Sequence, residues 1–208
     1  DTDNLELSAN STFIQKIKNL WFLSAGATLG MKDKNLNREE GILNEAGIYL
    51  DAGIPEFATE DRYIHPSFGL RRSTQRSQFN LSMAGRFNQF SRILAREPLS
   101  EQSYAFLLPR ISLEHTFRTG RRINFRYNTS INMPGPVQLF PVENSLNQLS
   151  IYQGNIDLTP EYQHNVRLGW SIFDQFSCTS FFARINATYT QNKISWSQSV
   201  DETFLQTI

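Results

Sequence analysis

The sequence is poor in the features that stabilise or equip most other classes of protein. Its 208 residues include a single cysteine, Cys178, which excludes an internal disulfide and a multi-cysteine metal site. We interpret Cys178, in the strand-like segment QFSCTSFF, as a packing residue. No segment approaches the run of about 18 apolar residues that a membrane-spanning helix needs. Charged residues make up only 19% of the chain, and the 20 basic and 20 acidic residues balance, so the composition indicates no nucleic-acid partner.

Signatures of catalysis are missing as well. The sequence contains no GxSxG, HExxH, P-loop or dinucleotide-binding pattern. His65, His115 and His164 are far apart, and none has Cys, Asp or Glu at the spacing of a metal ligand. The acidic stretch at 51–61 lacks the Asp-x-Asp-x-Asp spacing of a calcium loop, so a solvated loop is the better interpretation. We therefore expect no catalytic residue, cofactor or metal, and a protein other than an enzyme.

What the sequence does contain is a long alternation of apolar and polar residues. In RINFRYNTSINM, residues 122–133, the apolar side chains and Thr129 fall on one face of an extended strand and the polar ones on the other. Strands of soluble domains usually have about five or six residues, far fewer than here. The same pattern predicts eight strands in all, at 5–13, 21–31, 62–72, 79–90, 104–117, 122–133, 162–173 and 181–190. We predict an all-β antiparallel chain.

Short and long connections alternate between these strands. Tight polar turns are predicted at 15–18, 73–76, 118–121 and near 174–175, and long links at 32–61, 93–103 and 134–161. All long links therefore lie at the same end of the strand array. Long alternating strands with tight turns at one end and long loops at the other are typical of outer-membrane β-barrels, whose tilted strands need about 9–11 residues. A soluble antiparallel sandwich acting as an adhesin also alternates, and it is the alternative.

In a barrel, one face of each strand contacts lipid and the other faces the lumen. Phe125, Tyr127 and Ile131 would contact lipid, whereas the opposite face would line a wet lumen. The predicted lumen-facing residues are Arg86, Arg126, Asn128, Arg167 and Arg184. An arginine turned toward lipid at mid-depth costs ~2–4 kcal/mol, so these side chains are expected to pair with carboxylates inside the barrel or to attract an anionic cargo. Aromatic residues near strand ends would form the interfacial girdle, namely Trp21, Tyr104, Phe117 and Trp170.

The predicted topology places both chain ends at the long-loop end. The first strand runs toward the turn at 15–18 and the eighth runs back, so Asp1 and Ile208 both lie among the long loops. Bacterial outer-membrane barrels normally keep both termini at the opposite, periplasmic end. We therefore expect residues 1–208 to form one segment of a larger barrel, bounded at both ends within outer loops.

One stretch resembles a known family. GNIDLTPEYQHNVRLGW, residues 154–170, is similar to the pattern Gly-Asn-Pro-x-Leu-x-Pro-Glu-x-x-x-Asn found in the β-barrels of Bacteroidota TonB-dependent receptors. The matching residues are Gly154, Asn155, Leu158, Pro160, Glu161 and Asn165, whereas Ile156 stands where the family often has proline. The preceding stretch at 109–141 resembles the hairpin and Pro-interrupted loop of that family. We expect the motif to shape an outer loop, with Gly154-Asn155 in a left-handed backbone conformation and Glu161 accepting hydrogen bonds from loop amides.

The resemblance implies a barrel of about 22 strands, filled by an N-terminal plug and energised by TonB. The chain is then expected to be the barrel portion of a transporter that imports a nutrient across the bacterial outer membrane. The partners implied are outer-membrane lipid, the remaining barrel and plug segments, TonB and a surface lipoprotein lid. We expect neither a plug nor a TonB-contacting segment within these 208 residues. A barrel that anchors or assembles surface partners without transport is the alternative.

Overall fold

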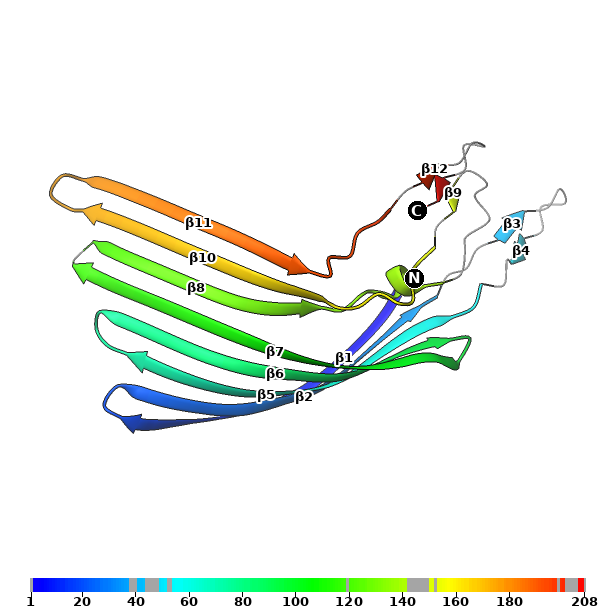
Figure 1. The fold of residues 1–208 in the computed structure, drawn as a ribbon, viewed down its shortest axis with the longest axis horizontal. Coiled ribbons are helices and arrows are strands. Elements are labelled where there is room, and N and C mark those ends of the chain that lie inside the picture. The colour runs from blue at the N-terminus through cyan, green and yellow to red at the C-terminus, as the bar shows by residue number, and fades with distance from the viewer. Residues whose placement is uncertain are drawn as a thin grey trace.

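Eight long strands form one antiparallel sheet, as the alternation predicts (Figure 1). The computed structural model describes residues 2–37, 41–43, 49–51, 54–118, 120–141, 150–151, 153–197, 199–200 and 206–207. The strands, in their order across the sheet, are β1 Thr2–Lys18, β2 Trp21–Leu36, β5 Phe57–Ser73, β6 Ser77–Leu94, β7 Glu97–Arg118, β8 Arg121–Asn132, β10 Glu161–Asp174 and β11 Thr179–Gln191. Each long strand pairs with the long strands before and after it in the chain, so the sheet is a meander of hairpins.

The remaining elements are short and lie at the loop end of the sheet (Figure 1). They are β3 Gly41–Leu43 with β4 Tyr49–Asp51, the helix α1 Pro136–Leu139, and β9 Ser150–Ile151 with β12 Ser199–Val200 and β13 Gln206–Thr207. Within the described ranges, no helix is long and apolar enough to span a membrane. Asp1 and Ile208, which were predicted to lie at this end, are outside the described residues.

The sheet is open, so these eight strands do not close into a barrel by themselves. Among the described residues, β1 pairs only with β2 and β11 only with β10. Side chains along both edge strands are almost all exposed, because each strand lacks a neighbour on one side. The prediction of a closed barrel of about 22 strands is therefore not supported by this sheet alone.

One of the predicted long links is wrong. Residues 93–103 lie in β6 and β7, which are joined by a two-residue turn at Ala95 and Arg96. Both turn residues have positive φ, 51° and 69°, as the turns that match the twist of a hairpin require. The sequence gives no Asn-Gly or Asp-Gly signal there. The turn predicted at 15–18 is also displaced, because β1 continues through it to a turn that begins at Asn19.

The interpretation of Cys178 as a packing residue in a strand is wrong as well. Cys178 is exposed, with a φ of 52°, in the turn between β10 and β11. This turn contains no glycine or proline. It is instead closed by Asp174, whose Oδ1 accepts a hydrogen bond from the Phe176 amide at 2.9 Å. An aspartate that bonds the backbone two residues ahead replaces the usual turn residues.

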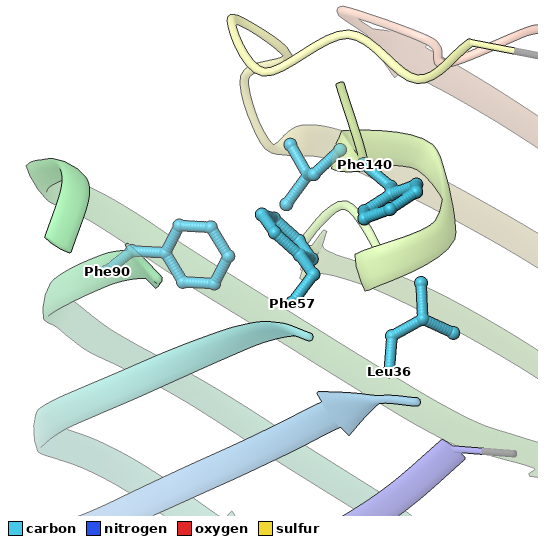
Figure 2. Packing of buried hydrophobic residues seen from close by; sticks show 5 residues of the cluster. Leu36, Phe57, Phe90 and Phe140 are labelled. Carbon is cyan, nitrogen blue, oxygen red and sulfur yellow. The ribbon is translucent and has the colours of Figure 1, made fainter. Parts of the chain in front are cut away.

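The hydrophobic core lies at the loop end, on one face of the sheet (Figure 2). Leu36, Phe57 and Phe90 contribute from three strands, while Leu139 and Phe140 arrive from α1 and the residue after it. The rings of Phe57 and Phe140 pack edge to face with centroids 5.8 Å apart. The segment after β8 therefore folds back onto the sheet. We call the face that it covers the inner face and the opposite one the outer face.

Two side chains at this end differ from their predicted orientation. Tyr104, expected in the outer girdle, lies directly opposite the buried Asn88 and packs against the core on the inner face. Met133, expected on the apolar face of its strand, also packs against the core, and its Sδ accepts a hydrogen bond from Asn88 Nδ2 at 3.7 Å. β8 ends at Asn132, so the strand alternation does not extend to Met133.

Candidate functional site

The outer face carries an apolar band across the sheet. Direct pairing aligns Ile185, Leu168, Phe125, Leu113 and Phe79 in one row across five strands. On each strand the band is about nine residues long, which is the length that a tilted membrane strand needs. It runs along 79–87 on β6, 105–113 on β7, 123–131 on β8, 162–170 on β10 and 181–189 on β11. A side chain such as Phe68, 65% exposed, has no protein to pack against there.

The loop-side limit of this band shifts steadily from one edge of the sheet to the other. Ala187 on β11 and Gln15 on β1 belong to the same paired row. The last apolar residue of the outer face on β11 is Tyr189, two residues after Ala187, whereas on β1 it is Leu5, ten residues beyond Gln15. The shift is about one residue per strand, which at a rise of ~3.3 Å and a strand spacing of ~4.8 Å gives a tilt of roughly 35–40°. That is the tilt of outer-membrane barrel strands.

The inner face is polar, and its loop half contains a buried ionic network. Asp61, 4% exposed, accepts hydrogen bonds from Arg86 Nη2 at 2.6 Å and from Asn88 Nδ2 at 2.9 Å. The Arg86 guanidinium also lies over the Tyr63 ring, 4.9 Å from its centroid. Arg86, predicted to face the lumen, therefore lies on the inner face and is already neutralised by a carboxylate of the sheet.

Arg92, which was not among the residues predicted from the sequence, joins the motif loop to the sheet. Its side chain is fully buried and donates to Ser100 Oγ at 3.0 Å, Gln102 Oε1 at 3.3 Å and the Leu158 carbonyl at 3.2 Å. Its guanidinium lies 5.2 Å from the centroid of the Phe90 ring. The period-2 pattern of β6 continues from Asn88 through Phe90 to Arg92 on the inner face, so extending the predicted strand would have revealed it.

The first half of the family motif holds the loop against α1. The Gly154 amide donates to the Phe140 carbonyl at 2.8 Å, and the Asn155 amide donates to the Gln138 carbonyl at 2.8 Å. A Cβ on Gly154 would lie 2.6 Å from the Phe140 oxygen, so only glycine permits this approach. Neither Gly154 nor Asn155 has a positive φ, so the predicted left-handed conformation is wrong. Leu158 packs against the core from the same loop.

The second half of the motif joins β10 to its neighbours. Pro160 is buried, and Glu161 accepts hydrogen bonds from Asn132 Nδ2 at 3.0 Å and from the Ile194 amide at 2.8 Å. Glu161 lies at the loop end of β10, beyond the apolar band, and these two bonds lower its pKa. Asn165 Oδ1 accepts from Thr188 Oγ1 on β11 at 2.9 Å.

The other predicted lumen residues come together in the turn half of the inner face. Arg126 lies directly opposite Arg167, and Asn128 lies directly opposite Asn165, on β8 and β10. Arg184, on β11, is opposite Gly169 and so shares their face. Arg86 is not part of this group. All three of these arginines are exposed.

The histidines and the acidic stretch do not form a metal site in the described part of the chain. Glu60 and Asp61 point to opposite faces of β5, where they pair with Arg62 at 3.2 Å and Arg86 at 2.6 Å, respectively. His115 Nδ1 is hydrogen-bonded to Ser77 Oγ at 2.7 Å, and His164 Nδ1 is hydrogen-bonded to Tyr127 Oη at 2.9 Å.

Comparison with known proteins adds one finding. The model of the outer membrane protein beta-barrel family matches residues 68–207, about two-thirds of the chain. The matched region runs from β5 to β13 and includes the whole motif loop. The comparison with curated proteins gave no match.

Proposed function

The chain belongs to the outer membrane protein beta-barrel family, and from this premise we propose that it forms part of the wall of a TonB-dependent transporter importing a nutrient across the bacterial outer membrane. The observation that carries the proposal is the contrast between the two faces of the sheet. The outer face presents a tilted apolar band about nine residues tall, as lipid requires. The inner face presents arginine, asparagine and serine, as a water-filled passage requires.

The open sheet supports a larger barrel. Unpaired backbone groups cannot be left in lipid, where each costs several kcal/mol. The edges β1 and β11 therefore need further strands as partners. A complete barrel of about 22 strands has room for a plug, whereas eight strands enclose only side chains or one small ligand. The motif from Gly154 to Asn165, which resembles that of TonB-dependent receptors, favours the larger size.

In the proposed mechanism, the loop end of the barrel binds cargo and the inner face forms the wall of the passage. The described parts of the loop after β8, 133–141 and 153–160, are anchored by Arg92 and by the core, and we propose that they form a rim at the mouth of the passage. Cargo would bind between such loops and the plug. TonB, driven by the proton-motive force, would then rearrange the plug and open a path along the polar inner face.

The test is intact mass and peptide mapping of the native particle after detergent extraction of outer membranes. We expect the chain to require detergent and to co-purify in fixed ratio with a plug segment that binds TonB. A particle with complete barrel peptides but no plug would instead indicate a barrel that anchors surface partners. Extraction into aqueous buffer without detergent would contradict both and favour a soluble sandwich.

A further inference from the structure

The turn half of the inner face is strongly basic, although the chain as a whole is neutral. Arginines from five strands share it, namely Arg71, Arg110, Arg126, Arg167 and Arg184. Among the described residues on this half of the face, the only carboxylate is that of Glu114, which already pairs with Arg122 at 3.3 Å. The acidic residues of the inner face lie instead at the loop end, for example Asp61 and Glu161. This half of the wall therefore has an uncompensated positive charge.

The register brings several of these charges close together. Arg126 on β8 lies directly opposite Arg167 on β10, a position in which like charges repel. On its other side Arg126 faces Ser112, two residues from Arg110 on the same face of β7. Arg167 Nε donates to Asn186 Oδ1 at 3.1 Å. The side chains of Arg110 and Arg126 have no hydrogen bond or ion pair with any described residue. Their donors are free to bind a ligand.

A hollow of about 420 Å³ lies at this point, lined by six residues of the inner face, Arg110, Arg126, Asn80, Ser82, Ser112 and Asn128, and by Ile111 and Tyr127 between them. The six inner-face side chains are two guanidinium groups, two hydroxyls and two amides, with no carboxylate. Guanidinium forms paired hydrogen bonds with the oxygens of carboxylate or phosphate. We propose that this hollow binds an oxyanion group of a small anionic cargo, with Arg110 and Arg126 as the binding residues.

The size and the surroundings of the hollow both favour a small solute. Sites for small molecules usually have volumes of about 300–1,000 Å³, a range that includes this one. Arg71 and Arg184 lie outside the hollow, on β5 and β11, and extend the positive potential along the wall. Such a field raises the local concentration of anions and guides them to the site. The proposed ligand would be the cargo of the proposed transporter. Only its import rests on the proposed function; the binding of an anion in the hollow does not.

The test is a binding titration of the full-length protein that contains this chain, purified in a zwitterionic detergent. The two probes are sodium pyrophosphate and sodium citrate, which separate phosphate from carboxylate recognition, with sodium chloride at equal ionic strength as reference. We expect saturable binding of at least one probe. Arg126→Gln and Arg110→Gln should each weaken that binding about tenfold or more, since each removes charge-assisted hydrogen bonds.

Arg122→Gln is the matched control, because it removes the same charge from the same face of the same strand. Arg122 lies outside the hollow and is already paired with Glu114, so its loss should change the affinity less than about twofold. Equal weakening by Arg122→Gln, or no saturable binding in the wild type, would overturn the proposal. The proposal would also be overturned if neither probe bound and Arg126→Gln had a lower melting temperature than the wild type. That result would indicate that the arginines pair with an acidic protein surface inside the barrel.

The titration needs neither TonB nor an energised membrane, so it is independent of the proposed function. Binding that depends on Arg126, in a protein without TonB-dependent uptake, would support the anion site and reject the transporter. TonB-dependent uptake by a protein that binds neither probe would support the transporter and reject the anion site.

Discussion

Replacement of Arg92 tests whether one buried guanidinium anchors the motif loop. Arg92→Ala removes hydrogen bonds to Ser100, Gln102 and the Leu158 carbonyl, and each bond to a charged donor contributes about 1.5–3 kcal/mol. The desolvation of the buried charge offsets several kcal/mol of that gain. The acceptors left behind cost about 1–3 kcal/mol each where water cannot reach them. We expect a net loss of about 3 kcal/mol, confined to the contact between the loop and the sheet.

Hydrogen exchange measures this loss at the loop itself. The amides of Gly154 and Asn155 donate to carbonyls at Phe140 and Gln138, so they exchange only when the loop separates from α1. A loss of about 3 kcal/mol should accelerate their exchange roughly 100-fold, while amides in the middle of the sheet keep their protection.

Arg96→Ala is the control for this experiment. Arg96 is four residues away, and its pair with Glu56 at 3.8 Å is exposed, so its removal should have an effect of about 1 kcal/mol or less. Exchange at Gly154 and Asn155 that rises less than about threefold in Arg92→Ala would refute the anchoring role.

Three further predictions concern the motif and the two faces. Gly154→Ala forces a Cβ to within 2.6 Å of the Phe140 oxygen and should destabilise the loop by about 1–3 kcal/mol, measured as faster proteolysis within 153–160; unchanged cleavage there would contradict the close approach. The hydrogen bonds that lower the pKa of Glu161 stabilise the folded loop at pH values above 4.5, the ordinary pKa of this group. This stabilisation is lost as the pH falls through the lower pKa of Glu161 in the folded state. The protection factors of the loop amides, which correct exchange for the intrinsic rate at each pH, should therefore fall at acid pH in the wild type, and Glu161→Gln should remove that fall. Met83→Arg on the outer face should cost ~2–4 kcal/mol in bilayer unfolding titrations. Ser24→Arg, on the inner face opposite the uncharged Ile14 and Gly69, should cost less than about 1 kcal/mol; equal costs would contradict the assignment of the faces.

The alternation of side chains was sufficient to predict the eight strands and, apart from Tyr104 and Met133 at the loop end, which residues share a face. Each strand pairs in register with the next, so the position of Arg126 relative to Arg167 follows from period 2 once the turns are known. The strand ends were harder to predict. Ala95 and Arg96 adopt positive φ without a turn signal in the sequence, because the paired strands on either side impose the geometry.

The contacts of the motif loop could not be predicted from the sequence. Gly154 was expected to be conformationally special, but it is needed because the Phe140 backbone approaches it across a sequence gap of fourteen residues. Arg92 is buried because the same loop covers it. The outcomes at Gly154 and Arg92 depend on how a distant segment folds back, which local alternation does not report. The face of Tyr104, in contrast, follows from period 2 counted back from Ile111 along β7, so its expected place in the girdle was inconsistent with the pattern itself.

The most direct test of the central claim is the accessibility of spin labels placed singly along residues 79–87 of β6, in a Cys178→Ser background in lipid bilayers. The account predicts a period of two, with labels at Leu81 and Met83 reached by oxygen dissolved in lipid and labels at Asn80 and Ser82 reached by a water-soluble nickel complex. The opposite phase, or protection of the apolar positions from both reagents as in the core of a soluble sandwich, would contradict the assignment of an outer face to lipid and an inner face to water.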